Sequence, residues 1–169
     1  MRGFEETTVE DIAHAAGISR RTFFRYFRSK NDVVWGDFDE LLQLFEASLG
    51  EAPSDQPWFA TLRDAVIQFN SFPAEDVAAH RQRMALILYV PALQAHSTLR
   101  YGSWRAVVAA FVARRLDQPE SSLAPQLIGH VALAAAVAAY EQWLAQPRTD
   151  LSDMIGASFD AVSLLLPSA

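Results

Sequence analysis

The sequence predicts an all-α protein, and three observations support that class. Apolar residues recur at spacings of three and four along most of the chain, which is the period of an amphipathic helix. No segment shows the alternating pattern of a β-strand, and no internal repeat is visible. Proline and glycine fall between the apolar stretches, where they interrupt helices. The periodicity therefore predicts about eight helices.

Two short helices joined by a glycine are predicted near the N-terminus. The first covers residues 8–16 and the second residues 20–27, and Gly17 can adopt the left-handed conformation that ends a helix. Phe23 and Phe27 are four positions apart, so they share a face that we expect to pack on the first helix. A basic second helix indicates a helix-turn-helix DNA reader, although two packed helices with a solvated basic face would show the same pattern.

The remaining helices follow from the apolar spacing and from the proline-rich and serine-rich loops between them. They are expected at residues 30–49, 57–71, 75–89, 91–116, 125–145 and 151–166. The helix at residues 30–49 is expected to be continuous and to join the two short helices to the rest of the chain.

Charge is distributed unevenly along the chain. The formal net charge is −6, but residues 1–31 carry six basic and four acidic side chains, hence +2, which leaves −8 for the remainder. Residues 19–30 contain five basic residues and no acidic one. A local positive patch on an acidic body allows contact with DNA without attraction to polyanions over the whole surface.

Composition argues against several other classes of function. Cysteine is absent, which excludes disulfides, thiolate metal sites and cysteine nucleophiles. The sequence has no glycine-rich phosphate loop and no metal-ligand cluster, so we expect no enzyme activity, no cofactor and no metal site. The acidic start does not resemble a secretory signal, and the longest apolar run, at residues 131–140, is far shorter than the roughly 20 residues of a membrane span. A cytoplasmic protein without membrane contact is expected.

Three segments resemble the N-terminal domain of the TetR family of bacterial transcriptional regulators. They are TTVEDIA at residues 7–13, AGIS at 16–19 and TFFRYFRSK at 22–30. More narrowly, residues 20–39 and 90–101 resemble the regulators associated with mycofactocin biosynthesis. The resemblance implies a TetR-like fold with a helix-turn-helix DNA-binding domain at residues 1–31 and a helical ligand-binding and dimerisation domain at residues 32–169.

The resemblance also implies a role for each DNA-facing position. The partner would be double-stranded DNA with a palindromic operator, bound by a homodimer that we expect to be a repressor. The residues implied in DNA contact are Thr8, Ser19, Arg20, Arg21, Thr22, Phe24, Arg25, Tyr26 and Lys30. Phe24 stands where the family often has tyrosine, so contact with a thymine methyl group would replace a hydroxyl contact.

Family members usually carry a further helix before the Gly3-Phe4 pair, and this sequence begins at Met1. We therefore expect the DNA-binding domain to be truncated at its N-terminus. The alternative function that follows is a non-enzymatic, small-molecule-binding helical dimer that has lost tight DNA binding.

Bulky rings mixed with a few polar groups predict a ligand pocket in the second domain, although plain core packing would show a similar stripe. The candidate residues are Trp35, Phe38, Phe69, Tyr89, His96, Tyr101, Trp104, Arg105, His130 and Tyr140. The effector would be small and largely apolar with a polar or anionic end, for which an acyl thioester is one candidate. A ligand pressing on Trp35 or Phe38 would move the DNA-binding helices. His80, in a charged stretch, is expected to be solvated.

The alanine-rich helix at residues 125–145 and the last helix suit a four-helix dimer interface, two helices from each chain. Intramolecular packing of the same two helices would explain the composition equally. The candidate interface residues are Leu127, Val131, Ala135, Ala138, Trp143, Met154, Ile155, Phe159 and Val162.

Overall fold

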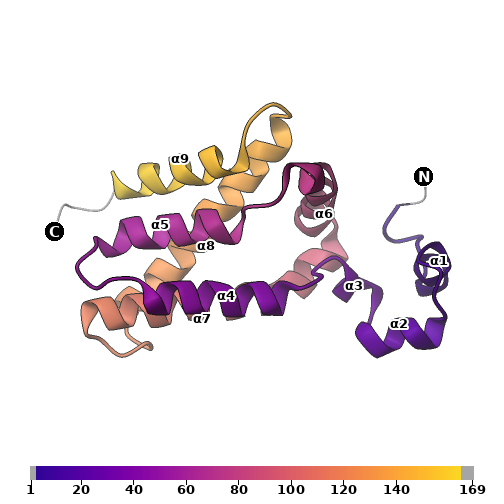
Figure 1. Ribbon diagram of the computed structural model, residues 1–169, viewed down its shortest axis with the longest axis horizontal. Coiled ribbons are helices and arrows are strands. Elements are labelled where there is room, and N and C mark those ends of the chain that lie inside the picture. The colour runs from indigo at the N-terminus through magenta and orange to yellow at the C-terminus, as the bar shows by residue number, and fades with distance from the viewer. Residues whose placement is uncertain (1–2, 165–169) are drawn as a thin grey trace.

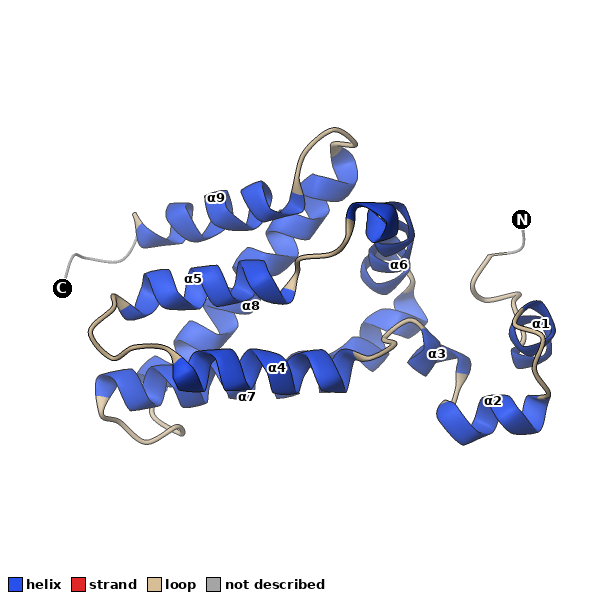
Figure 2. Cartoon of the chain, viewed as in Figure 1, coloured by secondary structure: helices blue, strands red, loops and turns tan. Residues whose placement is uncertain are grey.

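The computed structural model describes residues 3–164, and the regular elements in that range are all helices, so the all-α class is confirmed (Figures 1 and 2). The elements are α1 (Val9–Ala15), α2 (Arg20–Tyr26), α3 (Lys30–Val33), α4 (Phe38–Glu51), α5 (Trp58–Phe69), the short 3₁₀ helix η1 (Ala74–Asp76), α6 (Val77–Tyr89), α7 (Pro91–Leu116), α8 (Leu123–Ala145) and α9 (Leu151–Ser163).

The longer helices form a bundle, and α1 and α2 lie beyond one end of it. Figure 1 shows α4, α5 and α9 side by side, with α7 and α8 behind them. Helix α6 crosses the end of the bundle and packs on α7 and α8. Helix α3 contacts α7, so it connects the pair α1–α2 to the bundle. We call residues 3–27 the headpiece and the bundle the body.

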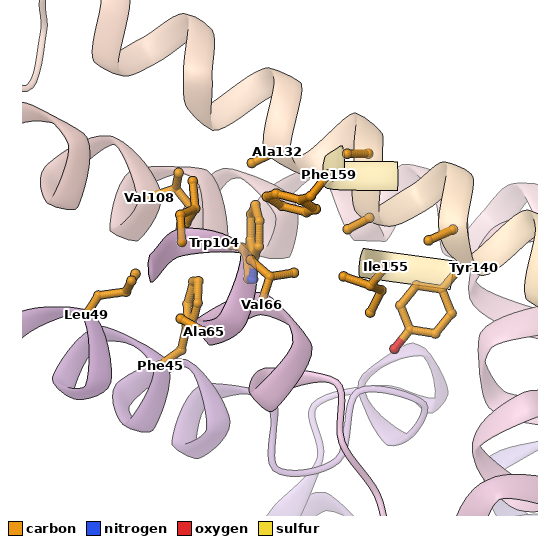
Figure 3. Packing of buried hydrophobic residues seen from close by; sticks show 14 of the residues in the cluster. Phe45, Leu49, Ala65, Val66, Trp104, Val108, Ala132, Tyr140, Ile155 and Phe159 are labelled. Carbon is orange, nitrogen blue, oxygen red and sulfur yellow. The ribbon is translucent and has the colours of Figure 1, made fainter. Parts of the chain in front are cut away.

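The core of the body is built from buried side chains of six helices, α4 to α9, some of which are drawn in Figure 3. Phe45 of α4 stacks on Trp104 of α7, with ring centroids 5.5 Å apart and planes 10° apart. Ile155 and Phe159 of α9 are almost completely buried beside α8. Burial of each such side chain stabilises the fold by about 1.5–3 kcal/mol. The body is therefore a well-packed domain that supports the elements leading to the headpiece.

The prediction of one continuous helix at residues 30–49 is wrong, because the helix is interrupted once. Helix α3 ends at Val33 and α4 begins at Phe38, and Gly36 between them has a φ of +48°. This left-handed conformation suits glycine and interrupts the helical hydrogen bonds. The apolar spacing of Trp35 and Phe38 continues the helical period, which concealed the interruption. We call residues 34–37 the break.

Helix α8 is long and apolar enough, by length and composition alone, to cross a membrane. One face of it, however, lies inside the body, where Gly129 and Ala132 allow close packing on α7 and α9. A core helix of a folded bundle passes the same test of length and hydropathy. Packing in the body therefore accounts for the buried part of α8, which is 39% of its apolar window.

Candidate DNA-binding surface and ligand cavity

The two headpiece helices are each capped by the hydroxyl residue that precedes them. Thr8 forms a capping box with Asp11, in which the Asp11 backbone N–H donates to Thr8 Oγ1 at 3.1 Å and the Thr8 N–H donates to Asp11 Oδ2 at 3.0 Å. Ser19 Oγ accepts from the Thr22 N–H at 3.0 Å and lies 2.9 Å from Thr22 Oγ1. The turn between the helices contains Gly17 with a φ of +66°. These local interactions define a helix-turn-helix.

Helix α2 buries one side chain and presents the others to solvent. Phe23 is 1% exposed and makes contact with Phe27 at a centroid distance of 5.4 Å, whereas Phe24 is 45% and Tyr26 66% exposed. Phe24 and Tyr26 are thus two exposed aromatic side chains on one short helix. Their exposure leaves them available to contact DNA.

The arginines of α2 lie on the same exposed surface. Arg20 pairs with Glu10 at 3.1 Å, and its guanidinium lies 5.5 Å from the Phe24 ring centroid. Arg25 donates to the Tyr26 hydroxyl oxygen at 3.0 Å. Such exposed pairs contribute only about 0–1 kcal/mol, so a phosphate or base can replace the partner. Arg21 is exposed and has no ion pair among the described residues.

Three predicted DNA contacts have their polar groups engaged inside the headpiece. The hydroxyls of Thr8 and Ser19 cap α1 and α2, as described above. The Lys30 ammonium donates to the carbonyl oxygens of Phe4, Glu5 and Thr7 at 2.9, 3.0 and 3.1 Å. These bonds use all three of its N–H donors. Lys30 thus holds the segment before α1 against α3, and phosphate contact through its side chain would require these bonds to break.

Asp32 connects the segment that follows the headpiece to the body. Its Oδ2 accepts from the backbone N–H groups of Arg28 and Ser29, both at 3.1 Å, and its Oδ1 lies 3.1 Å from His96 Nε2 on α7. The carboxylate is buried, with 7% of the residue exposed. One side chain therefore caps α3 and ties it to α7.

Helix α7 holds the chain on both sides of the break. His96 contacts Asp32 on the α3 side, and Arg100 forms an ion pair with Asp39 on the α4 side. Between these two contacts, the Trp35 ring packs edge-on against Tyr101, with centroids 5.9 Å apart. The break is thus bracketed by residues of a single helix.

A cavity of about 100 Å³ lies in the body next to the break. Its wall combines residues of the break, α4, the end of α5, α6, α7 and α8. Six of the predicted pocket residues contribute to it: Trp35, Phe38, Phe69, Tyr101, Trp104 and Tyr140. The break supplies Val34 and Trp35, so the cavity is in direct contact with the segment that leads to the headpiece.

The other four predicted pocket residues lie elsewhere. Tyr89 is 58% exposed, and His96 is engaged by Asp32. Arg105 contacts His130 at 2.8 Å on the outer surface of α7 and α8. These four predictions are corrected. None of the four is among the residues that line the cavity.

The sequence reasoning missed the polar part of the cavity, which contains His80, Asn70 and Arg83. The expectation that His80 is solvated is wrong, because the residue is only 6% exposed and lies 2.9 Å from the Tyr140 hydroxyl. Burial, aided by the charge of Arg83, lowers the pKa of His80 from 6.5 to about 4. Burial also raises the pKa of Tyr140 and of Tyr101. The histidine and both tyrosines are therefore neutral near pH 7.

The predicted dimer residues divide into two groups. Four are buried inside the single chain, namely Ala135, Trp143, Ile155 and Phe159. Their side chains pack within the body and leave no surface for a partner, so these four predictions are corrected. The other five remain accessible on α8 and α9: Leu127, Val131, Ala138, Met154 and Val162.

A helix-turn-helix with an exposed basic and aromatic recognition helix, joined to a helical body that contains an apolar cavity, defines a class of DNA-binding regulators. Residues 1–34 match the family model described as bacterial regulatory proteins, tetR family, and residues 56–167 match the model described as MftR C-terminal domain. The chain belongs to the TetR family of transcriptional regulators.

Curated relatives agree with this assignment. The proposed mycofactocin biosynthesis transcriptional regulator MftR of Mycobacterium tuberculosis (strain ATCC 25618 / H37Rv) is 42% identical over 160 residues, which are 95% of this chain and 81% of that protein. The HTH-type transcriptional regulator TcmR of Streptomyces glaucescens is 27% identical over 98% of this chain and 76% of its own length. The HTH-type transcriptional regulator EthR of Mycolicibacterium smegmatis (strain ATCC 700084 / mc(2)155) is 33% identical over 79% of this chain and 61% of its own length. The resemblance to the mycofactocin branch is thus confirmed.

Proposed function

We propose that this transcriptional regulator is a cytoplasmic, ligand-responsive repressor that binds a palindromic operator as a homodimer through α2. The observation that carries the proposal is the bracketed break, because its residues Val34 and Trp35 line the cavity and α3 connects it to the DNA-facing headpiece. In this proposal, residues 1–31 form the DNA-binding domain and residues 32–169 the domain for ligand and dimer.

The DNA side of the proposal rests on the free surface of α2. Its N-terminal residues would enter the major groove, where Arg20 and Arg21 can bind base edges or phosphates. Phe24 offers an apolar contact for a thymine methyl group, and Tyr26 a hydroxyl for the DNA backbone. In a symmetric dimer, the two copies of α2 would read half-sites about 34 Å apart.

The ligand side rests on the small size of the cavity. About 100 Å³ is well below the range of about 300–1,000 Å³ typical of ligand sites, so an effector must select a state with a larger cavity. An enlargement that displaces Val34 or Trp35 in the cavity wall would move the break. Asp32 and α3 would then move relative to α7, which changes the position of the headpiece. An apolar effector fits the wall, and an acyl thioester remains one candidate.

The dimer side rests on the outer face of α8. Leu127, Ala134 and Ala138 follow one another along this exposed face, and Leu127 is 54% exposed. Small side chains allow two helices to approach closely, so this face and the accessible part of α9 suit a four-helix interface.

A gel-shift titration with the region upstream of the protein's own gene tests the proposal. We expect a salt-sensitive complex that octanoyl thioester or a lipid extract of the host weakens. Unchanged DNA affinity at saturating extract would contradict the ligand response. Absence of any specific complex, together with retained binding of small apolar molecules, would favour a small-molecule-binding dimer without tight DNA binding.

A further inference from the structure

The wall of the cavity is mostly apolar, and three of its polar side chains form a hydrogen-bonded series. Asn70 follows α5, His80 belongs to α6 and Tyr140 belongs to α8, and all three are buried. Tyr140 Oη lies 2.7 Å from Asn70 Oδ1 and 2.9 Å from His80 Nε2. The ring of Phe72 covers the imidazole, with centroids 3.8 Å apart.

The direction of every hydrogen bond in this series of side chains follows from the Val66 carbonyl group at one end of it. The Val66 carbonyl oxygen can only accept, and it lies 2.7 Å from Asn70 Nδ2, so Nδ2 is the donor and Oδ1 faces Tyr140. Oδ1 can only accept, so the single hydroxyl proton of Tyr140 points to it. The Tyr140 oxygen is then an acceptor toward His80, which must carry its proton on Nε2.

This order leaves Nδ1 of His80 as an unprotonated nitrogen with a free lone pair. Nδ1 is buried, and no described residue donates a hydrogen bond to it. A second buried polar atom of the cavity wall, Trp35 Nε1, likewise lacks an acceptor among the described residues. A buried polar group without a partner costs about 1–3 kcal/mol. A ligand group that forms a hydrogen bond with either atom would therefore remove this cost on binding.

We propose that the effector enters with a hydrogen-bond donor, a hydroxyl or amide N–H on an otherwise apolar molecule, and that the donor pairs with His80 Nδ1, a buried atom that enlargement of the cavity would uncover. The inference rests on the proposed function, since it takes the cavity to be the effector site. A carboxylate cannot donate to Nδ1 and would be buried without a counter-charge there. Any anionic end of the effector would instead lie near Arg83, which borders the cavity and is exposed.

Two isomeric probes separate the hydrogen bond from size and hydrophobicity. 1-Octanol and heptyl methyl ether have the same atoms, but only the alcohol can donate. Both molecules have nearly the same size, so the free energy needed to enlarge the cavity is the same for each and cancels when their affinities are compared. Binding to the full chain can be followed through the fluorescence of Trp35 and Trp104 in the cavity wall. We expect the alcohol to bind about tenfold more tightly than the ether, and octanoate to bind more weakly than the alcohol.

His80→Phe keeps a ring of similar size in α6 and removes the acceptor. We expect this variant to lose the preference for octanol while its affinity for the ether changes little. Circular dichroism checks that the variant is folded. In the wild type, the ¹⁵N signal of His80 Nδ1 should be that of an unprotonated nitrogen, assigned by its loss in the variant. Octanol, but not the ether, should shift it.

The outcomes distinguish this inference from the function on which it rests. Equal or tighter binding of the ether in the wild type would overturn the role of His80 and leave the cavity as an effector site. Binding of none of the three probes would overturn both. A protonated Nδ1 in the ¹⁵N spectrum at pH 7 would also overturn the assigned hydrogen-bond order, whatever the affinities.

Discussion

At the scale of single residues, the buried hydrogen-bonded chain Asn70–Tyr140–His80 is the main polar feature of the body. It joins α5, α6 and α8 at the cavity, where a charged group would be costly. The neutral state of His80 is thus a consequence of packing. A buried neutral histidine also links folding stability to pH.

The first prediction concerns this linkage. The pKa of His80 is about 4 in the folded chain and about 6.5 when unfolded, so the unfolded chain takes up the proton first as the pH falls. Stability should therefore decrease from about pH 6.5 to about pH 4, by roughly 2–3 kcal/mol from this residue, and no further below that range. Urea unfolding of the wild type and of His80→Phe at several pH values measures the difference between them. An equal pH dependence of the two proteins would contradict the burial of a neutral His80.

The sequence could predict the helix-turn-helix but not this polar chain. Thr8, Gly17 and Ser19 act through local rules of capping and helix termination, which the order of residues reveals directly. His80 stands beside Arg81 and Arg83, and its charged neighbours favoured a solvated position. Its burial depends on how α6 is rotated against α8, and that rotation is set by contacts between residues 60 positions apart. Similarly, Trp143 and Phe159 had the right composition for an interface, but packing within the chain buries them.

At the scale of elements, the break between α3 and α4 is the feature that the helical period concealed. It depends on one left-handed glycine, and α7 holds it through His96 and Arg100. The headpiece and the body are thus connected by a segment of defined geometry, in which Trp35 packs against Phe38 and Tyr101. Changes at the break should affect the coupling more than the stability of the core.

The second prediction concerns Gly36. A Cβ added there would lie 3.9 Å from an Arg83 nitrogen, an ordinary contact, so the cost of Gly36→Ala is backbone strain of about 1–2 kcal/mol. The matched control is Gly50→Ala, because Gly50 lies in α4 with no atom within 4 Å of an added Cβ. We expect the control to stabilise the chain by about 0.5–1 kcal/mol. Thermal unfolding compares the two variants, and equal effects would show that the break is not strained by alanine.

The third prediction concerns the contact between His96 and Asp32. His96→Ala removes the link from α7 to α3 but leaves the Asp32 cap on α3 in place. We expect the effector to change DNA affinity by a smaller factor in this variant than in the wild type, with effector affinity nearly unchanged. DNA titrations with and without octanol give that factor. An undiminished effector response would exclude this contact from the coupling.

At the scale of the whole molecule, residues 1–31 carry a formal charge of +2 and the rest of the chain −8, and the exposed face of α8 lies on the bundle rather than on the headpiece (Figure 1). DNA and a second chain can therefore bind different parts of the protein. This separation lets a change in the body alter the distance between two headpieces in a dimer.

The fourth prediction concerns the dimer. Ala138 is exposed on α8, and Ala138→Arg would place a charge at the centre of the proposed interface. We expect this variant to be monomeric at concentrations where the wild type is dimeric. Ala47→Arg, on the exposed side of α4, is the control and should leave the dimer intact. Sedimentation velocity reports the mass of each, and a dimeric Ala138→Arg variant would locate the interface elsewhere.

The central claim is that α2 reads DNA, and Arg21 tests it most directly because it is exposed and has no ion pair among the described residues. Fluorescence anisotropy with a duplex from the upstream region can compare the wild type, Arg21→Ala and the control Arg148→Ala, which removes an equal charge from the loop after α8. We expect Arg21→Ala to weaken binding by about 1–3 kcal/mol, with a shallower salt dependence if Arg21 binds phosphate, and Arg148→Ala to have little effect. Equal losses in the two variants, or none in either, would contradict recognition of DNA by α2.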